Sequence, residues 1–363
     1  MRVLPTTPRR LAALALSACA VLPARAATVG APEDRKPVRI ATLAPQGSSS
    51  HQILLALGEK WRSGPEGGIK LIVNAGGLMG GESDVVSKMR AGQVQAGLLT
   101  AVGLGEIDRS SLALQGAPML FRTLDEVAYV REKMRASLEK RLLDKGFVAL
   151  FWGDVGWVKY FSRTPVIHPA DLKGVKLFTW TGSTGQVDLM KSLGLNPVPL
   201  EPNDILPSLR TGLIDAVSTA PYYAQVLQYY EPAPHMLDLA WAPLVGALVI
   251  TKKAWDTCPA TLQKVMLEAA TKAGEELTER NRKESDEAVE AMKKRGLVVH
   301  AVTPAIEAEW RAFIEPVYPK LRGMDVPADV FDEVQSVLAE YRKNAAPGSK
   351  PPEPKKTKPE PPH

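Results

Sequence analysis

The chain has 363 residues, 45% of them hydrophobic and 23% charged, a composition typical of a folded globular protein with room for two domains. Beyond the first few dozen residues, no apolar run approaches the roughly 20 residues that cross a bilayer, which excludes an integral membrane protein for the body of the chain. Removal of the N-terminal segment would take four of the 45 basic residues and none of the 40 acidic ones. With 41 basic residues left against 40 acidic ones, no nucleic-acid partner is predicted.

The N-terminus has the pattern of a secretory signal peptide. The pair Arg9-Arg10 precedes the apolar run 11–22, and Ala-Arg-Ala at 24–26 matches a signal-peptidase cleavage site. Residues 1–26 are therefore predicted to be removed on export. An alternative is a lipid anchor at Cys19, because the Leu-Ser-Ala-Cys that ends there fits a lipoprotein signal.

Short strands and helices alternate in the first part of the mature chain. Strands are predicted over 38–43, 70–73 and 96–100, and helices begin at Ser48 and Glu82. Alternation at this spacing predicts an α/β layered domain with a largely parallel sheet.

A second α/β lobe is predicted further along the chain. Its strands are expected over 148–152, 175–180, near Val198 and at 216–217, with a helix over 186–193. Between Pro259 and Gly296 there is no internal proline, and apolar side chains recur on one face of a helix about 50 Å long. Such a helix would span both lobes. Residues 344–363 are rich in proline and lysine and are predicted to be a disordered tail.

Residues that usually carry catalysis or bind metals are few and scattered. Without the signal peptide, Cys258 is the only cysteine, and its position before the long helix predicts a structural role. The five histidines show no metal-ligand spacing, and no Gly-x-Ser-x-Gly motif occurs. The glycine-rich segment 76–81 lacks the ending of a phosphate-binding loop. We therefore predict no metal, no cofactor and no enzymatic activity. The alternative interpretation is an extracytoplasmic enzyme, such as a hydrolase.

An ordered set of short motifs covers most of the mature chain. The set comprises APQGS at 44–48, GGLMGGE at 76–82, MRAG at 89–92, PMLF at 118–121, DLKGVKL at 171–177, LGLNPVP at 193–199 and LRTGLIDA at 209–216. In order and spacing, these motifs resemble the DctP-like solute-binding subunits of TRAP transporters.

The resemblance implies an α/β, two-lobed periplasmic binding protein. It would close about a hinge over one small molecule, carry a long helix spanning both lobes, and deliver its ligand to TRAP membrane permease subunits. On this basis, lobe I is expected to comprise residues 37–158 and 244–280, and lobe II residues 159–243 and 281–343.

The sequence departs from the family at the polar anchors for a ligand carboxylate. Phe178 and Val158 occupy the two positions where the resemblance places arginines, and Thr219 occupies the position of a family asparagine. A guanidinium makes two charge-assisted hydrogen bonds to a carboxylate, whereas Phe and Val make none. The departures predict a small apolar or amphipathic ligand.

Two arguments together predict a set of ligand-binding residues: the family resemblance, and the alternation of side chains between the two faces of a strand. The set is Gln46, Thr100, Trp157, Val158, Phe178, Trp180, Thr219 and Tyr222. Trp152 and Tyr223 are instead expected in the core. An alternative keeps an organic acid as ligand, with Lys159, Arg163 or Lys176 replacing the missing arginines.

Overall fold

The computed structural model describes residues 35–181 and 184–344. The predicted signal peptide, the alternative anchor at Cys19 and the tail from residue 345 onward lie outside these ranges. Within them, no helix combines the length and the apolar character that crossing a bilayer requires.

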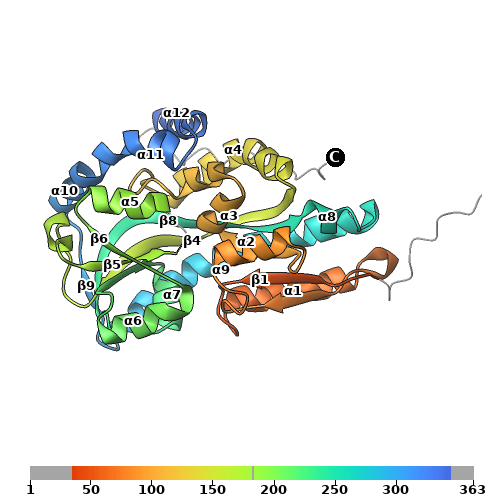
Figure 1. Ribbon diagram of the computed structural model, residues 1–363, viewed down its shortest axis with the longest axis horizontal. Coiled ribbons are helices and arrows are strands. Elements are labelled where there is room, and N and C mark those ends of the chain that lie inside the picture. Colours follow the sequence, from red (N-terminus) through yellow and green to blue (C-terminus); the bar gives the residue numbers. More distant parts are fainter. Residues whose placement is uncertain (1–34, 182–183, 345–363) are drawn as a thin grey trace, which may run out of the picture.

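Strands and helices alternate along most of the chain (Figure 1). The strands are β1 (Val38–Thr42), β2 (Leu71–Asn74), β3 (Ala96–Thr100), β4 (Phe147–Ser162), β5 (Lys176–Trp180), β6 (Asn196–Leu200), β7 (Ala216–Thr219), β8 (His235–Thr251) and β9 (Val298–His300). The helices are α1 (Ser49–Arg62), α2 (Glu82–Arg90), α3 (Ala101–Ile107), α4 (Leu124–Asp144), α5 (Thr184–Ser192), α6 (Ile205–Thr211), α7 (Pro221–Val226), α8 (Lys252–Trp255), α9 (Ala260–Lys293), α10 (Pro304–Ile314), α11 (Tyr318–Met324) and α12 (Ala328–Asn344).

The strands form one mixed sheet in the order β2-β1-β3-β8-β4-β7-β5-β6, with β9 paired to β8. At its centre, β8 runs antiparallel to both β3 and β4, and β4 runs antiparallel to β7. The outer pairs β1–β2, β1–β3 and β5–β6 are parallel. The prediction of a largely parallel sheet is therefore correct at both ends and wrong at the centre, where the paired residues of β4 and β8 lie far apart in the sequence.

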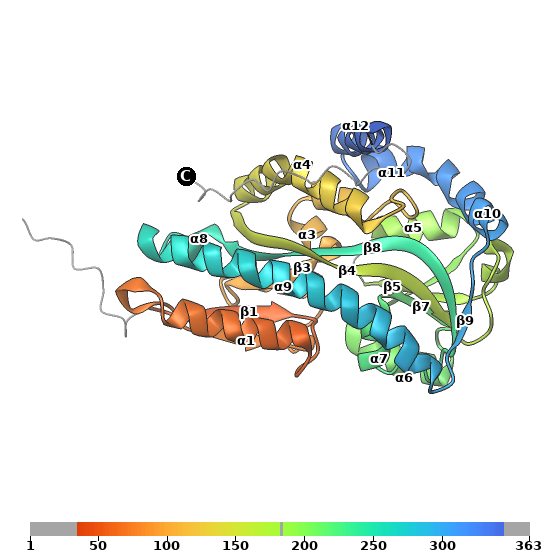
Figure 2. The same cartoon turned by 180° about the vertical axis from the view of Figure 1, so that it is seen from behind.

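Helix α9 spans both lobes, as the sequence predicts. It runs along the length of the molecule (Figure 2) and packs against α1 at one end, β4 in the middle and α7 at the other end. Its buried side chains include Leu262, Met266 and Leu277 in lobe I and Ala288 and Met292 in lobe II. A single helix thereby contributes to the cores of both lobes.

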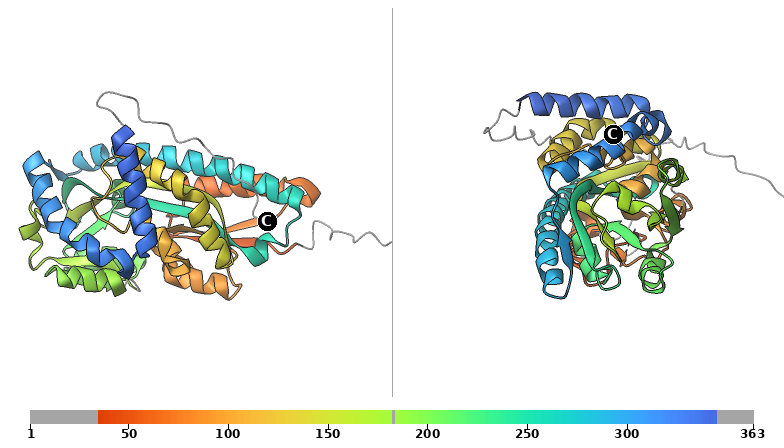
Figure 3. Two further views of the ribbon diagram at one scale, coloured as in Figure 1. Left: turned by 90° about the horizontal axis from the view of Figure 1, so that it is seen from above. Right: turned by 90° about the vertical axis from the view of Figure 1, so that its left-hand side faces the viewer.

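The C-terminal helices form an additional layer over lobe I and lobe II. Helix α12 packs across α4 (Figure 3), and Arg342 on α12 forms an ion pair of 2.7 Å with Glu126 on α4.

Cys258 lies just before α9, is 4% exposed and packs in the core beneath α1 and α9. Its surroundings fit the predicted structural role.

The long strand β4 changes register near its middle. Its pairing with β8 shifts between Asp154 and Trp157 and again between Val158 and Tyr160, and Gly156 adopts φ +94°. A residue inserted by a bulge reverses which side chains face each side of the sheet. These shifts lie where the sequence predicts the boundary between the lobes. The position of that boundary stays a prediction.

Candidate functional site

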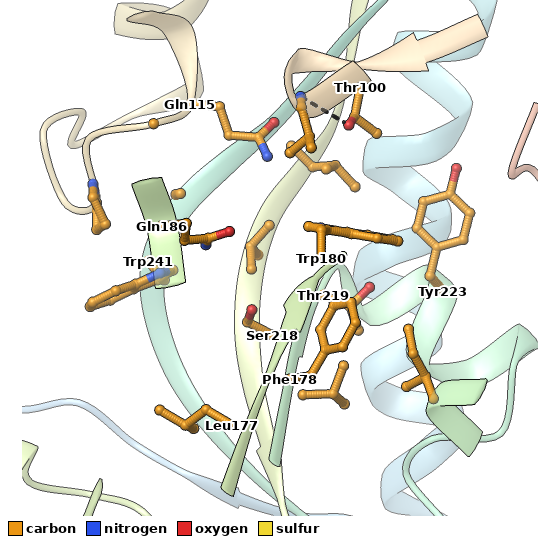
Figure 4. A pocket seen from close by; sticks show the side chains of 18 of the residues that line it. Thr100, Gln115, Leu177, Phe178, Trp180, Gln186, Ser218, Thr219, Tyr223 and Trp241 are labelled. Atoms are coloured by element: carbon orange, nitrogen blue, oxygen red, sulfur yellow. Dashed lines mark hydrogen bonds between the residues drawn. The ribbon is translucent and has the colours of Figure 1, made fainter. Parts of the chain in front are cut away.

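A cavity of about 440 Å³ lies between the lobes. Lobe I contributes Thr100, at the start of α3, and Gln115, which follows the 3₁₀ helix Arg109–Leu114. Lobe II contributes side chains from β5, α5, β7, α7 and β8 that converge on the same space (Figure 4). A volume of this size suits a small organic molecule.

Six of the eight predicted ligand-binding residues line this cavity. They are Gln46, Thr100, Val158, Phe178, Trp180 and Thr219. Phe178 and Trp180 lie on the same face of β5, and their ring centroids are 4.9 Å apart at 78°. This edge-to-face pair follows from the two-residue period of a strand.

Trp157 and Tyr222 do not line this cavity, and their role in ligand binding stays a prediction. Trp157 packs against the hydrophobic core, because the bulge that precedes it sets Val158 rather than its neighbour toward the cavity. The hydroxyl of Tyr222 accepts a hydrogen bond of 3.3 Å from the backbone N–H of Ser49, which holds its side chain against α1. Consecutive helix residues point about 100° apart, and on α7 it is Tyr223 that faces the cavity.

The two aromatic residues expected in the core have different positions. Trp152 is 4% exposed, and its indole N–H donates to Glu139 Oε1 at 3.2 Å, so the prediction holds. Tyr223 instead lines the cavity and packs edge-on against Tyr222, with ring centroids 5.3 Å apart. Burial raises the pKa of Tyr223, so its hydroxyl stays protonated at neutral pH.

The cavity lining carries more acidic than basic groups. Among the described residues, its charged members are Arg109, Glu106 and Asp325. Arg109 donates a hydrogen bond of 2.5 Å to the carbonyl of Met324. Burial raises the pKa of the Asp325 carboxyl, and the nearby positive charge of Arg109 offsets part of that rise. The guanidinium is therefore held by the Met324 carbonyl and lies close enough to Asp325 to influence its carboxyl.

The three basic residues proposed as replacements for the missing arginines do not line the cavity. Lys159 forms an ion pair with Asp238. Arg163 donates to the carbonyl of Leu209 at 2.8 Å. Lys176 binds the carbonyl of Gly212. Each of these ammonium or guanidinium groups has a partner within lobe II, so the structure gives this alternative no support.

Glu82 positions Thr100 at the cavity wall. Its buried carboxylate accepts hydrogen bonds from the N–H of Thr100 at 2.7 Å, the hydroxyl of Thr100 at 2.6 Å and the N–H of Gly103 at 2.9 Å. Burial raises the pKa of Glu82 even though these hydrogen bonds lower it. Because the Thr100 hydroxyl also accepts from the N–H of Val102 at 3.2 Å, little of its capacity remains for a ligand.

Neutral polar side chains provide the remaining hydrogen-bonding groups. The Oε1 atom of Gln115 accepts from the N–H of Val245 at 3.0 Å, which leaves its NH₂ group for the cavity. Gln186, Ser218 and Thr219 line the same space (Figure 4). Sequence reasoning missed Gln115, Gln186 and Ser218. Ser218 directly precedes Thr219 on β7, and both line the cavity although neighbouring strand residues ordinarily face opposite sides.

Nothing in the described ranges gathers three or more histidine, cysteine or carboxylate side chains in a way that holds a metal ion. What the geometry provides is a space between two lobes, lined by aromatic and aliphatic side chains and a few neutral polar groups. Such a site can bind and enclose a small molecule. Two α/β lobes around a cavity give the molecule the architecture of a solute-binding protein.

Comparison with known families gives the same class. Residues 40–323 match the DctP family, described as bacterial extracellular solute-binding protein, family 7. The match covers well over half of the chain, and the protein belongs to this family. The family assignment made from the sequence motifs is confirmed.

Two curated relatives illustrate the range of the family. A solute-binding protein of Sulfitobacter sp. (strain NAS-14.1) is 28% identical over 212 residues, 58% of this chain and 64% of that protein. The 2,3-diketo-L-gulonate-binding periplasmic protein YiaO of Escherichia coli (strain K12) is 27% identical over 314 residues, 80% of this chain and 89% of that protein.

Solved structures share the fold at low sequence identity. A TRAP periplasmic solute-binding protein of Xanthobacter autotrophicus Py2 with bound β-D-galacturonate has a TM-score of 0.76 at 20% identity, covering 83% of this chain and 99% of that one. A second, from Shewanella oneidensis with bound succinate, has a TM-score of 0.77 at 18% identity, covering 84% and 99%. The two-lobed α/β fold predicted from the sequence is thus confirmed.

Proposed function

We propose that this protein is exported to the periplasm, captures a small neutral amphipathic molecule in the cavity between its lobes, and delivers it to a TRAP-type membrane permease. The observation that carries the ligand class is the presence of Phe178 and Val158 in the cavity lining, at the positions where the family resemblance places arginines. The proposal that the protein binds rather than transforms its ligand is tested by a turnover screen with ester and amide substrates.

The charge balance of the lining supports this ligand class. A carboxylate beside Phe178 and Val158 would lose its hydration without gaining a bidentate partner, at a cost of several kcal/mol. Apolar surface buried against the same side chains gains about 25 cal/mol per Å². The amide of Gln115 and the hydroxyls of Ser218 and Thr219 would orient the polar part of the ligand.

Titration calorimetry with the purified protein tests the ligand class. Galacturonate, glucuronate and succinate should show no binding at micromolar concentrations, whereas the Xanthobacter autotrophicus protein crystallised with galacturonate serves as the positive control. Native mass spectrometry should recover a neutral molecule from the protein as purified. Micromolar binding of any of the three acids contradicts the proposal.

A second candidate ligand is an organic acid held by Arg109. It is favoured by Arg109 in the lining and by the acids named for the related proteins, 2,3-diketo-L-gulonate for one and galacturonate for another. The substitution Arg109→Gln separates the two candidates. An acid bound through the guanidinium should lose at least about tenfold in affinity. The affinity for a neutral ligand should change by less than about threefold.

Export and anchoring are tested on protein recovered from cells. Cleavage after residue 26 and acylation at Cys19 give mature chains of different mass and different partition between the soluble and membrane fractions. We expect the unlipidated mature chain in the periplasmic fraction. Loss of ligand uptake on deletion of the membrane subunits tests delivery to the permease.

A further inference from the structure

The cavity has a part that lies on the far side of the lobe II sheet. Leu177 and Phe178 are neighbours on β5, and Ala216 and Val217 are neighbours on β7, yet all four line the same cavity. Consecutive strand residues point to opposite faces of a sheet. The cavity therefore reaches both faces.

A gap in the sheet explains how one cavity reaches two faces. Strands β5 and β7 pair at a single position, Leu177 with Ala216, although each strand continues beyond it toward the interlobe space. Beyond this position no further residue pair joins the two strands within the described ranges, and Leu177 and Phe178 point to opposite sides of β5 (Figure 4).

We call the part of the cavity on the Leu177 side the apolar arm. Its wall is formed by α5, the loop after it, β8 and α10, which contribute Leu189, Met190, Leu193, Leu195, Trp241 and Phe313. None of these six side chains carries a charge or an oxygen atom. A ligand group that enters the arm gains by burying hydrocarbon.

Besides the indole N–H of Trp241, the hydroxyl of Tyr160 is a polar group at this wall. Tyr160 lines the cavity and is 6% exposed, with its ring 5.1 Å from that of Trp241 and 6.0 Å from that of Trp310. Among the described residues, no protein group pairs with its hydroxyl, and the residue lines the cavity, so the hydroxyl can be reached from there. A ligand oxygen in the arm can therefore accept a hydrogen bond from it.

We infer that the apolar arm is a specificity subsite that takes an alkyl or aryl group of a neutral oxygenated ligand, whose oxygen accepts a hydrogen bond from Tyr160. This inference rests on the proposed function and makes it more specific. The oxygen of such a ligand lies beside Tyr160, and its alkyl or aryl group extends from there along the arm.

A series of γ-lactones with methyl, butyl and heptyl side chains provides neutral probes. Titrated into the full chain, affinity should rise by about fourfold for each added carbon until the arm is filled. The substitution Met190→Trp, which narrows the arm, should abolish this rise, so that the methyl, butyl and heptyl lactones bind the variant with similar affinity. Leu55→Trp, at a 48% exposed position on α1, is the control for adding an indole elsewhere.

The substitution Tyr160→Phe tests the hydrogen bond without changing the shape of the wall. It should weaken lactone binding by about three- to tenfold and leave the binding of butylbenzene, which has no oxygen, unchanged. Circular dichroism and a denaturation curve establish that each variant is folded.

The outcomes separate the arm from the proposed ligand class. If the lactones bind but their affinity changes neither with the length of the alkyl chain nor with Met190→Trp or Tyr160→Phe, the arm is refuted. That result would leave the proposal of a neutral ligand standing. If the acids bind at micromolar concentrations and the lactones do not, both fail. If neither class binds, the arm is also refuted.

Discussion

Asp154 and Arg282 are joined by two hydrogen bonds of 2.7 and 2.6 Å, which connect the middle of β4 to the long helix α9. The Asp154 side chain is fully buried and also contacts Arg131 on α4 at 3.3 Å. One carboxylate thus holds two guanidinium groups at the point where β4 passes between the lobes. The arrangement fixes the strand against helices on both of its faces.

We expect Asp154→Asn to lower the free energy of unfolding by about 3 kcal/mol, because it removes the buried carboxylate that pairs with both guanidinium groups beside the strand. Urea denaturation followed by circular dichroism measures the change. Asp238→Asn is the matched control: Asp238 pairs with Lys159 but is 52% exposed, so its loss should cost less than about 1 kcal/mol. Equal effects of the two substitutions would contradict the prediction.

The substitution Phe178→Arg should change the ligand class. A guanidinium at this position faces the cavity and can bind a carboxylate through two hydrogen bonds. Titration calorimetry should show that affinity for galacturonate or succinate increases at least about tenfold over the unaltered protein. Phe178→Leu keeps the site apolar and should leave both acids unbound. An arginine variant that also fails to bind them would show that this position does not control ligand charge.

The stability of the protein should depend on pH through Glu82. Because burial raises the pKa of this carboxyl above 4.5, the folded chain binds more protons than the unfolded chain between pH 4.5 and the raised value. The free energy of unfolding therefore falls as pH rises through that window.

Glu82→Gln removes the titrating group and should flatten this part of the stability profile, measured by urea denaturation at a series of pH values. Glu287→Gln, at a position where the carboxylate is 63% exposed, is the control and should keep the fall. An unchanged slope in the Glu82 variant would assign the pH dependence to other groups.

Gly274 allows α9 to lie close against β4. A Cβ atom there would come within 2.6 Å of the Phe151 ring. We expect Gly274→Ala to destabilise the protein by about 1–3 kcal/mol from overpacking, in spite of the gain of about 1 kcal/mol in helix propensity. Thermal denaturation measures the change, and an increase in melting temperature would show that the two elements can separate without cost.

The sequence predicted the short elements well because their signals are local. The strand over 96–100 and the helix from Glu82 agree with the structure to within a residue, since glycines and apolar periodicity mark their ends. The strand expected at 148–152 is only part of β4, and β8 was not anticipated. Three register shifts interrupt the pairing of β4 with β8, and no local signal in the sequence joins strands that pair across two lobes.

The cavity was harder to predict than the fold for the same reason. Val158 and Phe178 line it as expected, but Trp157 and Tyr222 do not. At Trp157 the bulge decides which residue faces the ligand, and at Tyr222 the rotation of a short helix decides it. Gln115 and Gln186 lie in a loop and on an exposed helix, where periodicity says little about the direction of a side chain.

The pairing of β8 has a consequence for how this protein comes apart. The strand shares backbone hydrogen bonds with β3 in one lobe, with β9 in the other, and with β4 along most of its length. If either lobe unfolds, β8 loses backbone hydrogen bonds that also hold it in the other lobe. Differential scanning calorimetry should accordingly show one cooperative unfolding transition for the described part of the molecule, whereas two independently folding domains would give separate transitions.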